Sequence, residues 1–155
     1  MSSTNVSGNQ AESTLGVDMN FEVVTLPVAD VDRAKAFYQS LGWRLDIDLV
    51  ISDELRTVQF TPPHSGCSIQ FGKGRTSAEP GSAQAMILVI NDIDAARDDL
   101  INRGVDVSEV QEMKPPGFDA PGRSYFARAS FSDPDGNGWE LQEITTRLPG
   151  RSWEE

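Results

Sequence analysis

Cysteine and histidine are nearly absent from this sequence, which has one of each, Cys67 and His64, among its 155 residues. A single cysteine excludes an intramolecular disulfide and any zinc site that needs several cysteines. The lack of disulfides is typical of a reducing compartment, so we expect the protein to be cytoplasmic. His64 lies in a Pro-Pro-His-Ser-Gly segment, where we expect a solvated loop side chain and neither a metal ligand nor a base.

Positive charge is also scarce, because 13 Lys and Arg residues stand against 24 Asp and Glu residues, a formal net charge of −11. No run of basic residues occurs, so the sequence lacks the electrostatic signature of a nucleic-acid-binding protein. No apolar stretch approaches the roughly 20 residues that a membrane-spanning helix needs, and we expect no membrane partner. Residues 1–18 lack the basic and apolar segments of a secretory signal and are predicted to be a flexible tail.

The feature that organises the chain is a faint internal repeat at a spacing of 62 residues. Residues 26–43 read LPVADVDRAKAFYQSLGW, and residues 88–105 read LVINDIDAARDDLINRGV. In both copies an apolar strand leads into an aspartate that can cap a helix, and a glycine ends that helix. A unit that occurs twice predicts two similar modules that bury their faces against each other.

Hydrophobic periodicity predicts the order βαβββ in each module. In the first module the strands are residues 20–28, 43–51, 55–61 and 67–72, and the helix begins at Asp30 or Asp32 and ends at Gly42. In the second module the strands are residues 84–90, 105–113, 124–132 and 138–144, and the helix is residues 92–103. We therefore predict one α+β domain, made of a first module at residues 19–74 and a second at 83–145, with tails at 1–18 and 146–155.

Two motifs in the sequence carry a family resemblance. The stretch LPVADVDRAKAFYQSLGW and the later stretch FSDPDGNGWELQE resemble the first helix and the last hairpin of the glyoxalase/bleomycin resistance protein/dioxygenase proteins, the vicinal oxygen chelate superfamily. The resemblance covers residues 20–144. It implies that the paired βαβββ modules form an open cup of eight strands and that two copies form a homodimer. It also implies one divalent metal in the cup of the enzymes of this family.

The positions that hold this metal in the family's enzymes are poorly suited to it here. The resemblance places the two first-strand histidines at Val23 and Ala85, and the two last-strand ligands at Gln70 and Glu140. Valine and alanine cannot bind a metal, and one amide with one carboxylate makes a poor cage for a transition metal. We therefore predict no metal and no other cofactor; if a metal binds, Gln70 and Glu140 are its candidate ligands.

Strand alternation predicts which side chains line the cup. With Gln70 and Glu140 facing inward, so do Ser68, Val23, Thr25, Ala85 and Ile87. The third strands leave the choice open between Arg56, Val58 and Phe60 and their alternates Leu55, Thr57 and Gln59; in the second module Phe126 and Arg128 share a face. Phe118, on the Pro- and Gly-rich segment at 114–122, is a candidate lid. The predicted ligand-binding residues are Val23, Thr25, Gln59, Ser68, Gln70, Ala85, Ile87, Phe118, Phe126 and Arg128.

Alternation in residues 43–51 also predicts a half-buried strand. Its apolar residues, Trp43, Leu45, Ile47, Leu49 and Ile51, are expected to share the buried side, with the charged residues on the other side. On the first helix, Phe37 and Tyr38 lie on the apolar face and are expected to be core. Trp139 is also expected to be core, because it alternates with Glu140 and shares a face with Leu141.

The predicted function is the binding of a small organic ligand in the cup without a catalytic metal, because a small apolar lining with a few amides suits such a ligand. This resembles the family's drug-sequestering members, in which two copies of the cup trap a flat antibiotic. The alternative is an enzyme of the lyase, isomerase or dioxygenase type, with Glu140 as general acid or base. A salt bridge from Glu140 to Arg128 or Arg56 is an equally open interpretation. A regulatory or scaffold role, with a vestigial cup, is a third.

Overall fold

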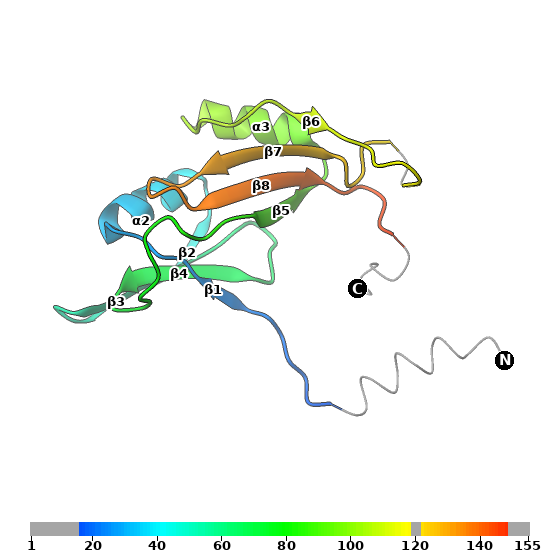
Figure 1. Ribbon diagram of the computed structural model, residues 1–155. Coiled ribbons are helices and arrows are strands. Elements are labelled where there is room, and N and C mark those ends of the chain that lie inside the picture. The colour runs from blue at the N-terminus through cyan, green and yellow to red at the C-terminus, as the bar shows by residue number, and fades with distance from the viewer. Residues whose placement is uncertain (1–15, 119–121, 149–155) are drawn as a thin grey trace.

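The computed structural model describes residues 16–118 and 122–148, which form two four-stranded sheets and two helices (Figure 1). The first module contains β1 (Val23–Thr25), α2 (Val31–Ser40), β2 (Arg44–Ser52), β3 (Leu55–Thr61) and β4 (Ser68–Lys73). The second contains β5 (Met86–Ile90), α3 (Ile93–Asn102), β6 (Gln111–Glu112), β7 (Ala127–Ser132) and β8 (Gly138–Glu143). The strand orders are β1-β4-β3-β2 and β5-β8-β7-β6, so the predicted α+β architecture of two βαβββ modules is confirmed.

Both helices begin at the aspartates that the repeat predicted. Asp30 caps α2 by accepting a hydrogen bond from Arg33 N at 3.1 Å, and Asp92 caps α3 by accepting one from Ala95 N at 3.0 Å. Of the two candidates for the first cap, Asp30 is therefore the correct one. The two helix-ending glycines of the repeat adopt left-handed conformations, which suit glycine at a helix end.

One hydrophobic core serves both modules. Tyr38 on α2 packs on Phe71 of its own sheet and also on Trp139 of β8, with ring centroids 5.6 and 6.2 Å apart. Trp43 contacts Trp139 edge-on at 5.2 Å. The helix-covered faces of the two sheets therefore meet in a common core, and each sheet is left with one open face. The predicted core positions of α2 and β8 are confirmed.

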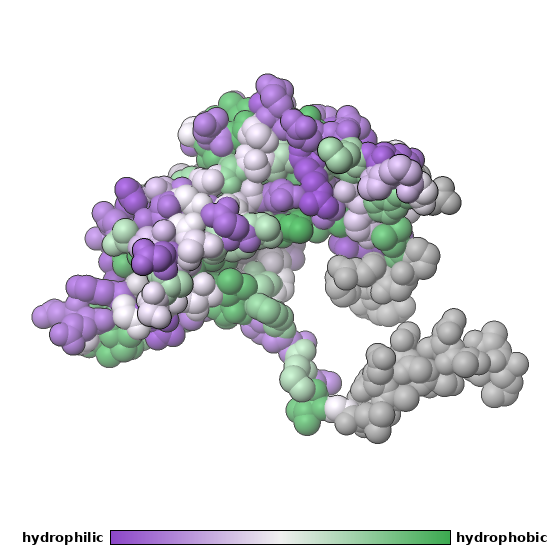
Figure 2. All heavy atoms as spheres, viewed as in Figure 1, coloured by the Kyte–Doolittle hydropathy of each residue, from purple (hydrophilic) through white to green (hydrophobic). Residues whose placement is uncertain are grey.

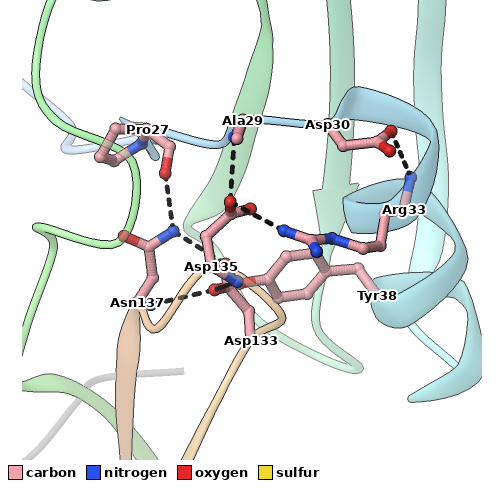
Figure 3. Close-up of polar contacts among 8 residues, drawn as sticks. All are labelled: Pro27, Ala29, Asp30, Arg33, Tyr38, Asp133, Asp135 and Asn137. Carbon is pink, nitrogen blue, oxygen red and sulfur yellow. Dashed lines mark hydrogen bonds and ion pairs between the residues drawn. The ribbon is translucent and has the colours of Figure 1, made fainter.

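A buried hydrogen-bond network joins the β7–β8 turn to the first module (Figure 3). Asn137 is fully buried and donates through Nδ2 to Pro27 O at 2.9 Å and to Asp133 Oδ2 at 2.8 Å. Tyr38 donates its hydroxyl proton to the same Asp133 oxygen at 2.9 Å. Burial, together with the Asp133 carboxylate, raises the pKa of Tyr38 well above its ordinary value. The network fixes how the second sheet sits on the first module.

Asp135 makes a second contact in the same turn (Figure 3). Its Oδ1 accepts from Ala29 N at 3.0 Å and from Arg33 Nη2 at 3.1 Å, just before and within the first turn of α2. The DPDGN motif, part of the stretch that shows the family resemblance, therefore holds the two modules together through hydrogen bonds.

Several predicted strands are shorter than expected. Residues 20–28 contribute only β1, and residues 105–113 contribute only β6, although Val105 and Val107 are buried in the core as expected of apolar residues. The predicted strand at 124–132 begins three residues late, since a turn in which Phe126 N donates to Arg123 O precedes β7. Ala85 has a φ of 60° and lies before β5, so the predicted first cup-lining residue of that strand is outside it.

Strand β2 does not keep one apolar face, which corrects the prediction for residues 43–51. A register shift between Leu45 and Ile47 places Leu45 opposite Phe60, on the helix-covered face, but Ile47 opposite Gln59, on the open face. Leu49 also lies on the open face, opposite Thr57. The bulge moves Ile47 and Leu49 to the side of the strand that the sequence pattern assigned to polar residues.

Neither helix of the described segments is long and apolar enough to span a membrane.

Candidate functional site

The open face of the second sheet carries a pocket of about 680 Å³. All of its lining residues belong to the second module. They are Ser108, Gln111, Met113, Pro115, Phe118, Tyr125, Phe126, Arg128, Ala129, Ser130, Glu140 and Gln142. A volume of this size is within the range of small-molecule sites.

An aromatic cluster forms one wall of the pocket. The Phe118 ring lies edge-on to Phe126 with centroids 4.5 Å apart, and 5.9 Å from Tyr125. Lys114 Nζ lies 5.2 Å from the centre of the Phe126 ring. Tyr125 adopts a φ of 71°, a conformation that a non-glycine residue takes only at some cost, and this turn presents Tyr125 and Phe126 to the pocket. Phe118 thus lies in the wall of the pocket, and its role as a lid stays a prediction.

The floor of the pocket consists of polar side chains that already bind each other or the backbone. Arg128 Nη1 lies 2.5 Å from Glu140 Oε1, with the arginine side chain 46% and the glutamate side chain 27% exposed. Gln142 Nε2 donates to Tyr125 O at 3.1 Å. Of the interpretations left open for Glu140, pairing with Arg128 is confirmed. Arg56 instead pairs with Asp48 on the other sheet.

The open face of the first sheet is lined by short polar side chains. Gln70 Nε2 donates to Thr25 Oγ1 at 2.8 Å, and the Thr61 and Ser68 hydroxyls lie 2.6 Å apart. Gln59 pairs with Gln70 across β3 and β4, so the alternates Leu55, Thr57 and Gln59 face this side. The other set, Arg56, Val58 and Phe60, lies on the helix-covered side, where Val58 and Phe60 are fully buried.

Asp46, the extra residue at the β2 bulge, anchors one end of this polar row. It accepts hydrogen bonds from Thr61 Oγ1 and from Gln59 Nε2, the latter at 3.2 Å, and from Arg44 Nε at 2.5 Å. Burial disfavours its charged form, but these hydrogen bonds outweigh that effect and hold the pKa of Asp46 below its usual value. The carboxylate therefore stays charged and holds the neighbouring hydroxyl and amide in place.

On both open faces, apolar side chains stay partly exposed in the part of the chain that the structure describes. Ile87 and Val89 on β5 are 48% and 44% exposed, and Ile47 and Leu49 on β2 are 43% and 52% exposed. Exposed apolar patches that flank a pocket mark ligand or protein interaction sites.

The predicted site residues thus fall into two groups. Phe118, Phe126, Arg128 and Glu140 come together in the pocket, and Ile87 lies beside Glu140 through strand pairing. Val23, Thr25, Gln59, Ser68 and Gln70 share the open face of the first sheet. Ala85 joins neither group. The alternation of the strands located both groups. Ser68 of one group and Ile87 of the other line a smaller pocket of about 210 Å³, so the two groups adjoin there.

Several pocket residues were missed by the sequence reasoning. Tyr125 was placed inside a regular strand, whereas its left-handed turn brings it to the pocket. Met113 and Pro115 come from the entry to the irregular segment at 114–122, whose residues 119–121 lie outside the described part of the chain. The clustering of proline, glycine and an aromatic there was the signal that could have identified this wall.

The donor set does not fit a catalytic metal. Val23 and Ala85 carry no donor atom, Glu140 is paired with Arg128, and Gln70 lies on the other sheet. Within residues 16–118 and 122–148, no group of three or more His, Cys, Asp or Glu side chains could hold a metal ion. Zn²⁺ and related metals usually take three or more protein ligands.

The family model of the Glyoxalase/Bleomycin resistance protein/Dioxygenase superfamily matches residues 20–141. The chain belongs to this superfamily. No curated protein sequence matches the chain significantly. Among solved structures, this superfamily member is similar to TnmS3, an antibiotic binding protein from Streptomyces sp. CB03234, with 27% identity and a TM-score of 0.68 over 84% of this chain and 99% of that one.

Two further structures extend the comparison. A glyoxalase/bleomycin resistance protein from the same Streptomyces strain is 29% identical, with a TM-score of 0.62 over 79% of this chain and 99% of that one. A lactoylglutathione lyase from Agrobacterium tumefaciens is 17% identical, with a TM-score of 0.59 over 83% of this chain and 96% of that one. The last similarity is one of fold alone.

Proposed function

We propose that this superfamily member is a cytoplasmic protein that binds a small, flat, largely apolar organic ligand without covalent chemistry and without a catalytic metal. The observation that carries the proposal is the pocket on the second sheet, with the Phe118 and Phe126 rings on one wall and the Arg128–Glu140 pair on its floor. Ligand sites typically combine such an apolar wall with a few placed polar groups.

The polar groups define the chemistry of the ligand. Arg128 and Glu140 neutralise each other, so the floor offers hydrogen-bond donors and acceptors without net charge. An uncharged ring system that carries hydroxyl or carbonyl oxygens matches this floor, and its faces can pack against Phe118 and Phe126. A strongly anionic or cationic ligand would have to displace Glu140 or Arg128 from the salt bridge between them. TnmS3, which binds an antibiotic, supports aromatic antibiotics as the first ligand class to test.

The complete cup is proposed to form between two copies. Each open face is a half-cup whose apolar residues, Ile87 on one sheet and Ile47 on the other, are about half exposed in the single chain. A two-fold homodimer would place the first sheet of one copy opposite the second sheet of the other, and this closes two identical cups. The row of Gln59 and Gln70 then faces the aromatic wall across the ligand.

The enzymatic alternative has less support. A general acid or base must be free to exchange a proton with the substrate. The Glu140 carboxylate is held by Arg128, and no histidine lies in the pocket, whose lining residues all belong to the described part of the chain.

A thermal-shift screen tests the proposal. Protein treated with a chelator is screened against aromatic antibiotics, catechols and thiol adducts of α-keto aldehydes. We expect aromatic antibiotics to raise the melting temperature in a saturable manner. Arg128→Ala should weaken the shift, whereas Arg103→Ala, which breaks an exposed ion pair with Asp99 on α3, should leave it unchanged. If only the keto-aldehyde adducts or the catechols raise the melting temperature, or if any ligand does so only after metal is added back, the result would instead favour the enzyme.

A further inference from the structure

Gln142 on β8 is a polar residue that is almost entirely buried and yet lines the pocket on the second sheet. It is 6% exposed, whereas the side chain of Arg128, directly opposite it on β7, is 46% exposed. Burying an amide is unfavourable unless its polar atoms find hydrogen-bond partners. The partners of Gln142 therefore define what the pocket requires of a ligand at this point.

The nitrogen end of the Gln142 amide binds the backbone. Its Nε2 donates to Tyr125 O at 3.1 Å. The reversed orientation of the amide would bring its oxygen against the carbonyl oxygen of Tyr125, and neither of these atoms carries a proton to share. The contact with Tyr125 O therefore fixes which end of the amide faces the backbone.

The turn that carries this carbonyl is held by hydrogen bonds on both sides. Tyr125, at a φ of 71°, donates its N–H to Glu143 O at 2.7 Å. The fully buried Ser124 hydroxyl donates to Thr146 O at 2.8 Å and accepts from Thr146 N at 3.1 Å. A non-glycine residue keeps a left-handed conformation only where the surrounding structure enforces it, and such residues cluster at ligand sites. The turn is therefore a fixed support for the Gln142 side chain.

The oxygen end of the amide, Gln142 Oε1, is left for the pocket. It accepts no hydrogen bond from residues 16–118 or 122–148. In these segments the side-chain atoms that are both fully enclosed and unpaired are Arg123 Nε and Asp135 Oδ2, so Gln142 Oε1 is not enclosed. Since Gln142 lines the pocket, its accessible oxygen is an acceptor of fixed orientation for a ligand.

The neighbour of Gln142 offers the opposite chemistry. Arg128 pairs with Gln142 across β7 and β8, which Figure 1 shows side by side, and Figure 2 shows hydrophobic residues beside hydrophilic ones at this end of the second module. Arg128 uses Nη1 to bind Glu140 and keeps further N–H groups for a ligand. A ligand oxygen that accepts a hydrogen bond therefore suits Arg128, whereas Gln142 Oε1 needs a ligand group that donates one.

We propose that Gln142 is a specificity-determining residue, which selects flat ring ligands that carry a hydroxyl group at the edge facing β8. The inference rests on the proposed function and deepens it by naming the substituent that the ligand must carry. A ring hydroxyl donates its proton to Gln142 Oε1, whereas a methoxy or methyl group in its place leaves this oxygen without a partner. A site built to hydrogen-bond a ligand hydroxyl discriminates strongly against the analogue that lacks it.

Three matched probes measure this selectivity in equilibrium dialysis. They are 2-hydroxyanthraquinone, 2-methoxyanthraquinone and 2-methylanthraquinone, compared at a pH at which the hydroxyl group is protonated. We expect the wild-type protein to bind the hydroxyl probe about tenfold or more tightly than either analogue. Gln142→Met keeps the length of the side chain but removes the amide, so the three dissociation constants should agree within about threefold. Gln39→Met makes the same substitution at an exposed position of α2 and should keep the wild-type ratios.

The comparison on the wild-type protein depends on no variant, so it decides the inference even if Gln142→Met fails to fold. Equal binding of the three probes would overturn the inference and leave the proposed function standing. Weaker binding of the methoxy probe alone would reflect its size and would also overturn the inference. Wild-type ratios in a folded Gln142→Met variant would show that another residue selects the hydroxyl group. If neither these probes nor any aromatic antibiotic binds, the proposed function itself is wrong, and the inference falls with it.

Discussion

Replacing Tyr38 by phenylalanine removes one buried oxygen that joins the two modules. The Tyr38 hydroxyl donates to Asp133 Oδ2 at 2.9 Å and accepts from Trp139 Nε1 at 3.0 Å (Figure 3 shows the first of these). The ring itself packs in the core and stays in place in the variant. The change therefore isolates two hydrogen bonds without opening a large cavity.

The magnitude follows from what each partner loses. The hydrogen bond to a carboxylate contributes about 1.5–3 kcal/mol, and a buried N–H left without an acceptor costs about 1–3 kcal/mol. Asp133 keeps Asn137 as a donor, which lowers the first contribution. We expect Tyr38→Phe to lower the free energy of unfolding by about 2–4 kcal/mol.

Urea unfolding at one fixed protein concentration measures this loss, because association with a second copy also contributes to stability. The chain has 2 tyrosines, and the other provides the control. Tyr125 accepts one hydrogen bond at its hydroxyl, from Leu148 N at 3.1 Å, so Tyr125→Phe should cost less than about 1 kcal/mol. A Tyr38→Phe variant no less stable than Tyr125→Phe would refute the account of the inter-module network.

Three further predictions concern charge. Burial and a neighbouring carboxylate raise the pKa of Tyr38 in the folded protein. The free energy of unfolding should therefore fall as the pH rises above 10.0, the pKa of tyrosine in the unfolded chain. An absorbance titration should show that this phenol ionises only when the protein unfolds. Hydrogen bonds from Arg56 lower the pKa of Asp48 from 3.8 to about 2, so the contribution of ionised Asp48 to the free energy of unfolding is lost as the pH falls from 3.8 to about 2. Asp48→Asn should remove this part of the acid dependence of stability, as measured by urea unfolding at several pH values. Glu140→Gln leaves Arg128 unpaired, so direct titration should show anthraquinone sulfonate gaining affinity relative to uncharged anthraquinone; an unchanged ratio would contradict the neutral floor.

Much of the fold was predictable because the signals are local. Asp30 and Asp92 as caps, and the alternation around Gln70 and Glu140, each depend on a few neighbouring residues. The repeat then assigned equivalent positions to both modules. Ala85 is the exception, since its left-handed conformation is not visible in a run of apolar residues.

The features that the sequence did not reveal depend on contacts between distant segments. The bulge near Asp46 reverses the faces of β2, and no alternation pattern indicates where a bulge occurs. Tyr125 reaches the pocket through a turn stabilised by Glu143 O, which accepts from Tyr125 N at 2.7 Å. The packing of the two modules determines whether the open faces form one cup or two half-cups. This packing depends on core contacts such as that between Tyr38 and Trp139.

The most direct test of the central claim, a metal-free ligand cup shared by two copies, is a complementation measurement. Ile47→Glu blocks the first-sheet half and Phe118→Ala removes the aromatic wall of the second-sheet half. Each homodimer should bind no antibiotic in equilibrium dialysis with a chelator present. After the two variants are mixed and their subunits exchange, half of the dimers are mixed, and each regains one intact cup, so about a quarter of the wild-type binding should return. If mixing restores no binding, the cup does not form between copies and the account is wrong.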